Sequence, residues 1–446
     1  MKIGFIAMSG VRAVNKELME KGFTLPGFVE RQKIIASLPS LSLLTLAGMT
    51  PDRFDIEYLE VADLRKAPKL PDDFDLVAIS TFTAQVKDAY ELADRYRACG
   101  AKVVMGGLHV TSLPQEALRH CDAVVVGEGE VTWPRVLADF ERGQLKRFYS
   151  AAGVEFDFSE APMPRFELLD IDKYNRITVQ TQRGCPWRCE FCASSILLTP
   201  KYKVKPVAKV MAEIQRIKEF WPDPFIEFAD DNTVVNKPHG KELMRALAKE
   251  GVRWFTETDI SVAEDEELLS MMHDAGCAQI LIGLESPVTT GLDGLEGRKN
   301  WKLQQLGRYE RAIKTIQSHK ITVNGCFILG LDGQGPEIFE LVPQFVRESG
   351  LYEVQITVQT AFPGTPLYQR LLQEGRLLDP LAWEKCTLFD VNYRPQDMTV
   401  RELETGLLEL GASLYNAEAL RERRRAFRRM ARGLPHRREP EPVLAQ

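Results

Sequence analysis

Three cysteines stand close together in one short stretch of the chain. Cys185, Cys189 and Cys192 are spaced C-x3-C-x2-C within residues 181–195, TQRGCPWRCEFCASS. A glycine and a proline in this stretch indicate a loop, and the run Ile-Thr-Val just before it indicates a strand. A loop of this kind can direct three thiolates at one centre.

The number of cysteines favours an iron–sulfur cluster with one open iron. Iron–sulfur clusters are held by cysteine thiolates, and a four-iron cluster takes one ligand per iron. Three cysteines therefore leave one iron free to chelate a substrate, just as a catalytic zinc site keeps a position that a structural one closes. A zinc site is the first alternative, but no second cysteine pair or nearby histidine is present. Cysteines that only pack in a core are the second.

With Phe191 before its last cysteine, the stretch resembles the signature of the radical S-adenosylmethionine (SAM) superfamily. In that family the open iron binds the amino and carboxylate groups of SAM. An electron from the reduced cluster then cleaves the sulfonium and yields methionine and a 5′-deoxyadenosyl radical. The resemblance implies that Cys185, Cys189 and Cys192 hold a [4Fe–4S] cluster and that the Phe191 backbone faces adenine. It also implies a reductase, flavodoxin or ferredoxin as electron donor.

Length and composition describe an ordinary globular protein. A chain of 446 residues has room for two or three domains, and its net charge of −6 gives no sign of a nucleic-acid partner. Its start reads as a strand rather than a signal peptide, and no apolar run is long enough to cross a bilayer. Eight cysteines in a chain of this length do not suggest a disulfide scaffold. Because an exposed iron also needs reducing conditions, we expect a cytoplasmic protein.

The first 150 residues alternate apolar strands with helices. Five strands in such alternation predict an α/β domain with a doubly wound, Rossmann-like parallel sheet at residues 1–150, with its boundary between residues 145 and 175. The expected strands are residues 2–8, 55–61, 76–80, 102–105 and 123–126, and the expected helices are residues 42–48, 85–99 and 114–120.

Small and polar residues gather where these strands end. Ligands of doubly wound sheets sit beyond the carboxyl ends of the strands, where glycines let the backbone approach a flat ligand and hydroxyls bind its amides. Any one of these glycines could be a tight turn only, but four strand ends together are harder to dismiss. The candidate residues are Ser9, Ser80, Thr81, Phe82, Thr83, Gly106, Gly107, His109, Val110, Gly127 and Glu128.

This third resembles the cobalamin-binding domains that are fused to many radical SAM enzymes. Ser80-x-Phe82 corresponds to their Ser-x-Leu turn and Gly106-Gly107 to their Gly-Gly turn, while GGLHVTSLPQEAL followed by DAVVVGEGE looks like the fused class. The Asp-x-His-x-x-Gly motif that supplies a lower axial histidine elsewhere is missing. The resemblance therefore implies a cobalt without a histidine ligand, and His109 is either a loop contact or an ordinary turn histidine.

After the cysteine loop, strands and helices alternate with a longer period. Six such units predict a partial (β/α)6 barrel over residues 151–395, with its chemistry at the carboxyl ends of the strands. The expected strands are residues 177–179, 225–229, 254–258, 279–284, 322–329 and 353–358, and the expected helices are residues 207–220, 240–249, 265–275, 305–318 and 337–348.

The ends of these strands again carry polar residues. Asp230 and Asp231 could be helix N-caps and nothing more. By resemblance to the radical SAM family, the run IGLES places Glu285 and Ser286 near the ribose or methionyl group of SAM. The same resemblance sets a fifth-strand glycine motif and a Pro-Gly-Thr turn beside adenine. The candidate SAM contacts are Phe191, Glu257, Glu285, Ser286, Gly325, Phe327 and Phe362.

The last segment, residues 396–446, is predicted to be helical, with leucines at near-helical spacing followed by many arginines. We favour a solvated terminus for these arginines, because charge runs at chain ends are usually just soluble. Docking on a membrane surface or on a nucleic-acid backbone is the alternative. The segment resembles the accessory region of radical enzymes that act on hopanoids, tetrapyrroles and antibiotic scaffolds, which implies a small-molecule substrate of the lipid, tetrapyrrole or natural-product kind.

Together the two resemblances imply a cobalamin-dependent radical SAM methyltransferase. The deoxyadenosyl radical would remove hydrogen from an unactivated carbon, and methylcobalamin would supply the methyl group; cluster, SAM and cobalamin carry this chemistry. A cyclase or rearranging enzyme without methyl transfer is one alternative. A non-catalytic corrinoid or redox sensor is another, and it would need a fourth cluster ligand, for which Cys277 and Cys326 are the candidates.

Overall fold

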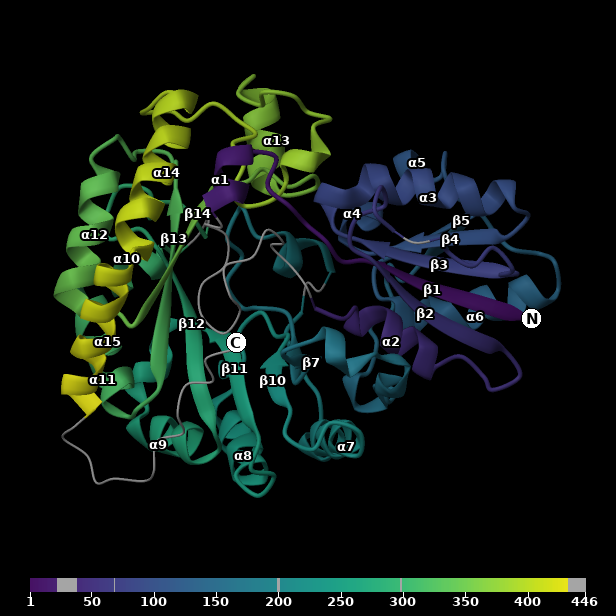
Figure 1. The fold of residues 1–446 in the computed structure, drawn as a ribbon, viewed down its shortest axis with the longest axis horizontal. Helices are drawn as coiled ribbons and strands as arrows, with labels where there is room; N and C mark the ends of the chain where they lie inside the picture. Colours follow the sequence, from purple (N-terminus) through teal and green to yellow (C-terminus); the bar gives the residue numbers. More distant parts are fainter. Residues whose placement is uncertain (22–37, 68, 199–200, 297–298, 432–446) are drawn as a thin grey trace.

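The computed structural model describes residues 1–21, 38–67, 69–198, 201–296 and 299–431. Over these residues the chain forms two lobes, each built on a six-stranded parallel sheet (Figure 1). The N-terminal lobe holds the first sheet, and the larger lobe holds the second. This arrangement confirms the predicted α/β class with two parallel sheets and a helical C-terminal region.

The first sheet has the strand order β2-β1-β3-β4-β5-β6. Because the order reverses between β1 and β3, the crevice beyond the carboxyl ends of these two strands is where a doubly wound sheet binds its ligand. All five predicted strands are present. The strands are β1 (Lys2–Met8), β2 (Asp55–Val61), β3 (Leu76–Thr81), β4 (Lys102–Gly106), β5 (Ala123–Val126) and β6 (Phe148–Ser150).

Helices cover both faces of this sheet. Alternate residues of one strand face opposite sides, so that Val77 and Ile79 pack with α3 while Leu76 and Ala78 pack with α2 and α6. The sixth strand and α6 were not predicted. The helices are α1 (Lys16–Lys21), α2 (Leu41–Gly48), α3 (Val86–Ala98), α4 (Leu108–Ser112), α5 (Pro114–Ala117) and α6 (Gly129–Glu141).

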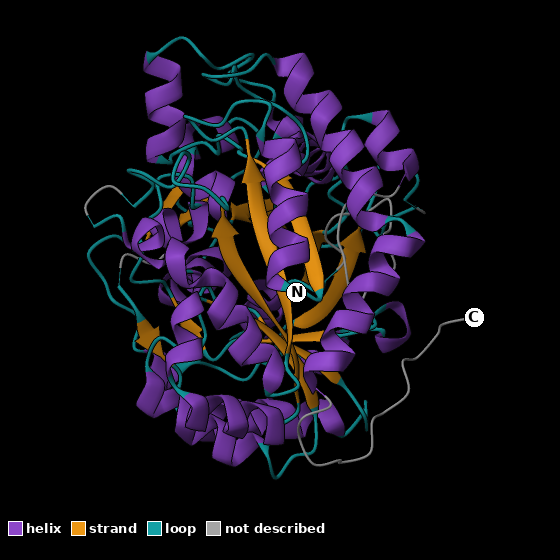
Figure 2. Cartoon of the chain, turned by 90° about the vertical axis from the view of Figure 1, so that its left-hand side faces the viewer, coloured by secondary structure: helices purple, strands orange, loops and turns teal. Residues whose placement is uncertain are grey.

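The second sheet runs in the order β14-β13-β12-β11-β10-β7, and over the described residues it does not close on itself. Helices surround it, with the strands inside (Figure 2), which confirms the partial barrel and all six predicted strands. The strands are β7 (Ile177–Val179), β10 (Phe225–Phe228), β11 (Arg253–Thr258), β12 (Cys277–Glu285), β13 (Thr322–Leu329) and β14 (Glu353–Val358).

The outer helices of the barrel match the prediction with one exception. The long helix expected at residues 305–318 is divided into a short α10 and α11 by a turn of 3-10 helix. A two-stranded antiparallel hairpin, β8 (Gln182–Arg183) and β9 (Lys203–Val204), flanks the cysteine loop. The helices are α7 (Val207–Lys218), α8 (Lys237–Leu247), α9 (Glu266–Asp274), α10 (Trp301–Gln305), α11 (Tyr309–Ser318) and α12 (Ile338–Ser349).

The C-terminal region contains α13 (Pro366–Gln373), a 3-10 turn at Trp383–Lys385, α14 (Val400–Tyr415) and α15 (Ala417–Ala431). The last two helices run along the outside of the barrel beside α11 and α12 (Figure 1). Arg423 of α15 is buried and forms an ion pair with Glu353 at 3.3 Å. Part of the arginine run is therefore structural; residues 432–446 lie outside the described part of the chain.

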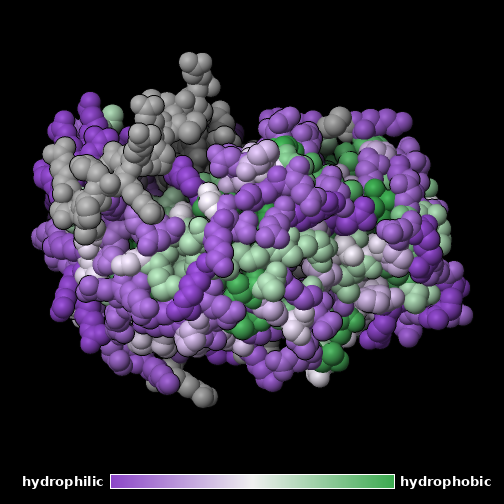
Figure 3. Space-filling view, turned by 90° about the horizontal axis from the view of Figure 1, so that it is seen from below, coloured by the Kyte–Doolittle hydropathy of each residue, from purple (hydrophilic) through white to green (hydrophobic). Residues whose placement is uncertain are grey.

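The face of the molecule seen from below is largely hydrophilic, with smaller apolar patches between the charged residues (Figure 3). Among the described residues, none of the helices combines the length and apolar character that crossing a bilayer requires.

Candidate functional site

Two neighbouring aspartates anchor the start of the cysteine loop. The Asp230 carboxylate accepts hydrogen bonds from the backbone N–H groups of Thr181 and Gln182, at 2.8 and 3.1 Å, and from the Thr233 hydroxyl at 2.9 Å. Asp231 accepts from the Gly184 N–H at 2.9 Å and from the Ser194 hydroxyl. The alternative that these aspartates are helix caps is therefore wrong, because they bind the loop instead.

None of the three cysteines of this loop forms a disulfide. Burial raises the pKa of Cys185 to about 11 and that of Cys189 to about 12. Thiols with such pKa values are protonated near neutral pH, so they become thiolates when a cation replaces the proton. This donor set fits a metal centre.

The three thiols are the ligand type that an iron–sulfur cluster takes. Within the described residues, no three His, Cys, Asp or Glu side chains converge closely enough to hold a metal ion. A four-iron cluster is larger than one ion and holds its thiolates further apart, and cysteine thiolates are its usual protein ligands. Cys185, Cys189 and Cys192 are thus the residues that would hold it, and this assignment stays a prediction.

A buried ion pair lies beside Cys189. The Lys302 ammonium lies 2.5 Å from the Glu285 carboxylate and donates to the Gly283 carbonyl at 2.9 Å. Burial alone would lower the pKa of Lys302, but the charge of Glu285 outweighs it and raises that pKa. Glu285 also has a left-handed backbone with φ of 62°, a strained conformation that often marks a functional position. Sequence reasoning missed Lys302, because nothing in WKLQQ signals a partner in a strand.

Two tryptophans cover this end of the loop. The rings of Trp187 and Trp301 stack with centroids 4.2 Å apart, and the Trp187 indole N–H donates to Asp259 at 2.9 Å. These contacts fix the loop between Cys185 and Cys189 against the carboxyl end of β11 and the first residue of α10.

Glu257 points into the interior of the barrel. Solvent reaches its carboxyl group, yet protein surrounds it closely, and this desolvation together with the carboxylates of Glu227, Asp231 and Glu285 raises the pKa of Glu257 to about 8. The Cys326 thiol is also close to Glu285 and Glu257, so it faces the same interior. A carboxyl group that keeps its proton near neutral pH can donate a hydrogen bond to a ligand.

Three predicted SAM contacts direct no side chain into the barrel interior. The Ser286 hydroxyl is fully buried and donates to the Thr290 carbonyl at 3.0 Å. Phe327 is fully buried against Phe345 of α12, on the outer face of β13, and a Cβ on Gly325 would meet Leu351 on that face. Only backbone atoms of these residues are left to contact a ligand in the barrel.

Phe362 and the turn after it lie where the two lobes meet. Phe362 is partly buried against the core of the N-terminal lobe. A Cβ on Gly364, whose φ is +83°, would lie 2.8 Å from the Ser112 hydroxyl of α4. This close approach requires a glycine at position 364. The Pro-Gly-Thr turn is therefore explained by the contact that it makes with the N-terminal lobe.

The predicted corrin contacts gather at the ends of β1, β3 and β4. Ala7 pairs with Ser80 and Ser80 with Gly106, which brings Ser9, Phe82 and Gly107 to one edge of the sheet. Gly107 has a φ of +103°, and a Cβ on it would lie 3.4 Å from the Ser80 hydroxyl. Phe82 exposes half of its surface, whereas Ser9, Thr81 and Thr83 are buried. This cradle suits a large flat ligand.

Three further candidates have partners within the protein. His109 is buried, with Nε2 3.2 Å from Glu116, and Val110 is fully buried. The Gly127 N–H donates to Thr111 at 3.1 Å. The side chains of His109 and Val110 therefore face the core of the lobe, and only the backbone of these residues and of Gly127 is left to contact a ligand.

Glu128 connects the two lobes. Its carboxylate accepts from Arg183 at 2.8 Å and from Lys203 at 2.6 Å, while Arg183 also donates to Glu130 at 2.7 Å. Since Arg183 lies two residues before Cys185, the end of a strand in the first sheet is joined directly to the cysteine loop. Arg183 and Lys203 were not predicted.

Comparisons with protein families agree with this geometry. Residues 179–346 match the radical SAM superfamily, and residues 33–137 match the B12 binding domain. Residues 365–445 match a domain of unknown function, DUF4070.

Individual relatives and solved structures extend the match over both lobes. The bacteriochlorophyllide d C-12(1)-methyltransferase of Chlorobaculum tepidum is 28% identical over 397 residues, covering 87% of this chain and 84% of that protein. The hopanoid C-2 methylase of Rhodopseudomonas palustris is 28% identical over 358 residues, covering 77% and 66%. The fold is similar to that of the radical SAM methyltransferase TsrM from Kitasatospora setae, solved with cobalamin and a [4Fe–4S] cluster, with a TM-score of 0.66, 15% identity and coverage of 94% and 89%.

The partial barrel carries the three-cysteine loop, and the doubly wound sheet carries the cradle for a flat ligand. These two parts define a radical SAM protein fused to a B12-binding domain. More particularly, the chain belongs to the cobalamin-dependent radical SAM enzymes. Its cofactors are a [4Fe–4S] cluster, SAM and cobalamin. The residues that contact them, and the domain limits at residues 150 and 395, stay predictions.

Proposed function

We propose that this enzyme transfers a methyl group to an unactivated carbon of a small molecule. The contact of Arg183 with Glu128 carries the proposal, because it joins the cysteine loop to the strand ends where a corrin would lie. When bound, the cluster with SAM supplies the radical that removes hydrogen, and cobalamin supplies the methyl group.

The residues of the chain then have the task of placing these groups. Cys185, Cys189 and Cys192 would hold the cluster, and Asp230 and Asp231 fix the loop that carries them. Below the loop, the barrel encloses a polar interior to which Glu257 of β11, Asn324 of β13 and Thr178 of β7 contribute. Asn324 and Thr178 are almost fully buried, and each has a side-chain oxygen without a hydrogen-bond partner in the described structure. These oxygens are free to accept hydrogen bonds from a ligand.

The names of the relatives support methyl transfer and suggest a substrate class. One relative is a bacteriochlorophyllide methyltransferase and another is a hopanoid methylase. We infer that the substrate here is also a large, mostly apolar scaffold such as a tetrapyrrole or a polycyclic lipid. The electron donor would be a reductase, flavodoxin or ferredoxin. The arginines of α15 that are exposed would be the residues for a peripheral contact with a membrane.

Product analysis of anaerobically purified protein tests the proposal. We expect absorbance from both cluster and corrin, 5′-deoxyadenosine together with S-adenosylhomocysteine, and a gain of one methylene in the mass of candidate tetrapyrroles or lipids. Formation of 5′-deoxyadenosine without S-adenosylhomocysteine would instead favour a cyclase or rearranging enzyme.

The sensor alternative requires a fourth protein ligand for the cluster. Cys277 is buried in the apolar core outside the barrel, and its thiol lies 3.8 Å from the Gln279 carbonyl, so it is a poor candidate. Cys326 faces the interior and is the better one. If Cys192→Ala keeps its fold and still cleaves SAM, the assignment of the open cluster fails.

A further inference from the structure

Residues 365–398, which we name the clamp segment, lie between the two lobes. They contain α13, which stands at the top of the junction in Figure 1. The whole segment falls in the match to a domain of unknown function, and the proposed function leaves it without a task.

One side of the clamp segment holds the cysteine loop. The hydroxyl of Thr365 caps α13, and the Leu367 N–H in its first turn donates to the Glu190 carbonyl at 3.1 Å. Arg370 donates to both carboxylate oxygens of Glu190, at 2.6 and 3.2 Å. Glu190 stands between Cys189 and Phe191. A two-pronged contact of arginine with carboxylate fixes orientation as well as distance.

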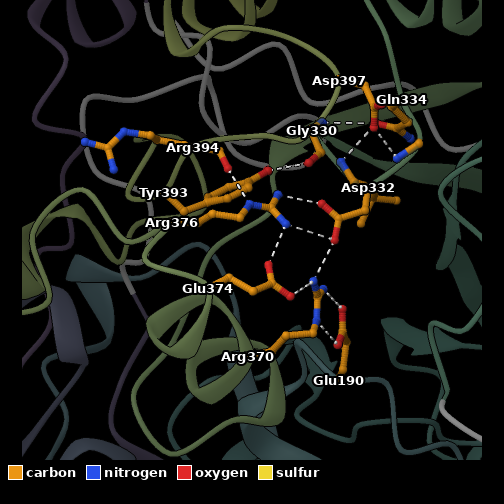
Figure 4. Close-up of polar contacts among 12 residues, drawn as sticks. Glu190, Gly330, Asp332, Gln334, Arg370, Glu374, Arg376, Tyr393, Arg394 and Asp397 are labelled. Atoms are coloured by element: carbon orange, nitrogen blue, oxygen red, sulfur yellow. Dashed lines mark hydrogen bonds and ion pairs between the residues drawn. The ribbon is translucent and has the colours of Figure 1, made fainter.

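A second carboxylate sets the direction of Arg370. Asp332, in the turn after β13, accepts from Arg370 at 2.7 Å and from Arg376 at 2.6 Å (Figure 4). Arg376 and Arg370 outweigh the effect of burial and lower the pKa of Asp332, so this carboxylate stays charged. Asp397 accepts from the Gly333 N–H at 2.7 Å and ties the same turn to the end of the segment. The arginine is therefore held in one orientation by a network rather than by a single pair.

The other side of the clamp segment is embedded in the cobalamin-binding lobe. Trp383 is buried in the core of that lobe, and its ring meets the His109 ring at 5.2 Å and 73°. Asp390 is also buried and accepts from the N–H groups of Val14 and Asn15, both at 2.8 Å, in the loop that follows β1. Residues 11–18 pack with the core of the barrel lobe, so Asp390 holds the chain where it passes from β1 to that lobe.

We propose that the clamp segment sets the position of the cysteine loop relative to the cobalamin-binding lobe, with Arg370 as the positioning residue that acts through Glu190. The inference rests on the proposed function in one respect: it assumes that the two cofactor sites work on one substrate. Without the contact, the loop keeps its cysteines and its aspartate anchors, but its last turn loses the orientation that Arg370 imposes. Cleavage of SAM then continues while its coupling to methyl transfer is weakened.

The experiment compares Arg370→Gln with Lys314→Gln in the full-length enzyme loaded with all cofactors. Lys314 is a matched control, since it forms an exposed ion pair with Glu310 at 3.2 Å on the outer helix α11. Two quantities are measured: the electron paramagnetic resonance spectrum of the reduced cluster with and without SAM, and the ratio of deoxyadenosine to methylated product. We expect Arg370→Gln to change the spectrum with SAM and to raise the ratio about tenfold, because misplacing reacting groups by about 1 Å can cost up to roughly a hundredfold in rate. Lys314→Gln should match the wild type in both.

Two further variants separate positioning from simple stability. Arg370→Lys keeps the charge without the planar fork, so it should restore the ratio only in part. Glu190→Gln combined with Arg370→Gln should be no worse than Arg370→Gln alone, since both changes remove the same contact. If Arg370→Gln lowers the melting temperature while the spectrum and the ratio stay at wild-type values, the clamp has no positioning role and the inference is wrong.

Failure of the proposed function would look different. In that case the wild type itself would form no methylated product. Arg370→Gln and Lys314→Gln could still be compared by two measurements that need no methylated product. These are the electron paramagnetic resonance spectrum of the reduced cluster with SAM and the slow formation of deoxyadenosine without substrate. A changed spectrum would then support the clamp, and an unchanged one would overturn it.

Discussion

Replacing Lys302 by methionine should strongly destabilise the barrel, because it leaves the Glu285 carboxylate buried without a counter-charge. The side chains of Lys302 and Glu285 are 11% and 7% exposed, so water cannot take the place of the ammonium group. Removing one partner of a buried ion pair typically costs about 3–5 kcal/mol. We expect a loss of this size at pH 7.

The same magnitude follows from the proton that Glu285 would take up instead. An ordinary glutamate loses its proton near pH 4.3, and each pH unit above that costs about 1.36 kcal/mol, so holding the proton at pH 7 costs roughly 3.7 kcal/mol. At pH 5 this cost falls to about 1 kcal/mol. The folded variant then binds a proton that the unfolded chain releases, so its stability falls as the pH rises through this range. The loss of the hydrogen bond to Gly283 adds about 1 kcal/mol at either pH.

Urea unfolding at pH 5 and pH 7, followed by tryptophan fluorescence, measures this difference. The stacked rings of Trp187 and Trp301, 4.2 Å apart beside the ion pair, make fluorescence a local probe. The double variant Glu285→Gln with Lys302→Met removes both charges and should lose only about 1–2 kcal/mol at both pH values. Equal losses for the single variant at pH 5 and pH 7, or a loss below about 1 kcal/mol at pH 7, would refute the reasoning.

Three other outcomes are expected. Asp230→Ala leaves the N–H groups of Thr181 and Gln182 buried and unpaired, which costs about 1–3 kcal/mol for each group. It should therefore lower both the melting temperature and the iron content of the protein. Asp223 is exposed, so the control variant Asp223→Ala should change neither quantity. Because the pKa of Glu257 is raised to about 8, the folded chain keeps a proton that the unfolded chain has lost; Glu257→Gln should raise the melting temperature more at pH 8 than at pH 5, and an equal gain would contradict this. Cys326→Ser should retain the iron content and SAM cleavage of the wild type, and loss of cluster iron in this variant would identify a fourth ligand.

Buried parallel strands were predictable because each is a short apolar run that ends where polar or small residues begin. Residues 76–80 and 322–329 are read correctly from this pattern alone, since a strand buried on both faces has few polar residues. The strand Phe148–Ser150 could not be read in this way, because it has three residues and only Tyr149 is buried. Helix α6 was missed for a related reason: Pro134 interrupts its pattern.

Side-chain roles were less predictable than elements. The periodicity of a strand tells which residues alternate, but not which face turns towards the barrel interior. Phe327 was expected beside SAM for its place in a motif, yet it packs outward against Phe345. Cys326, one residue earlier, faces inward for the same geometric reason.

The contacts around the cysteine loop explain why local patterns could not reveal its setting. The loop is held by Glu128 through Arg183 before the first cysteine, by Asp231 at Gly184, and by Arg370 through Glu190 after the second. The partners lie 55, 47 and 180 positions away along the chain. Each contact joins a different part of the fold to the same few residues, so the position of the loop depends on how the whole molecule is assembled. An enzyme that must bring two large cofactors to one carbon atom gains from this dependence, because the loop cannot take its final geometry until both lobes are in place.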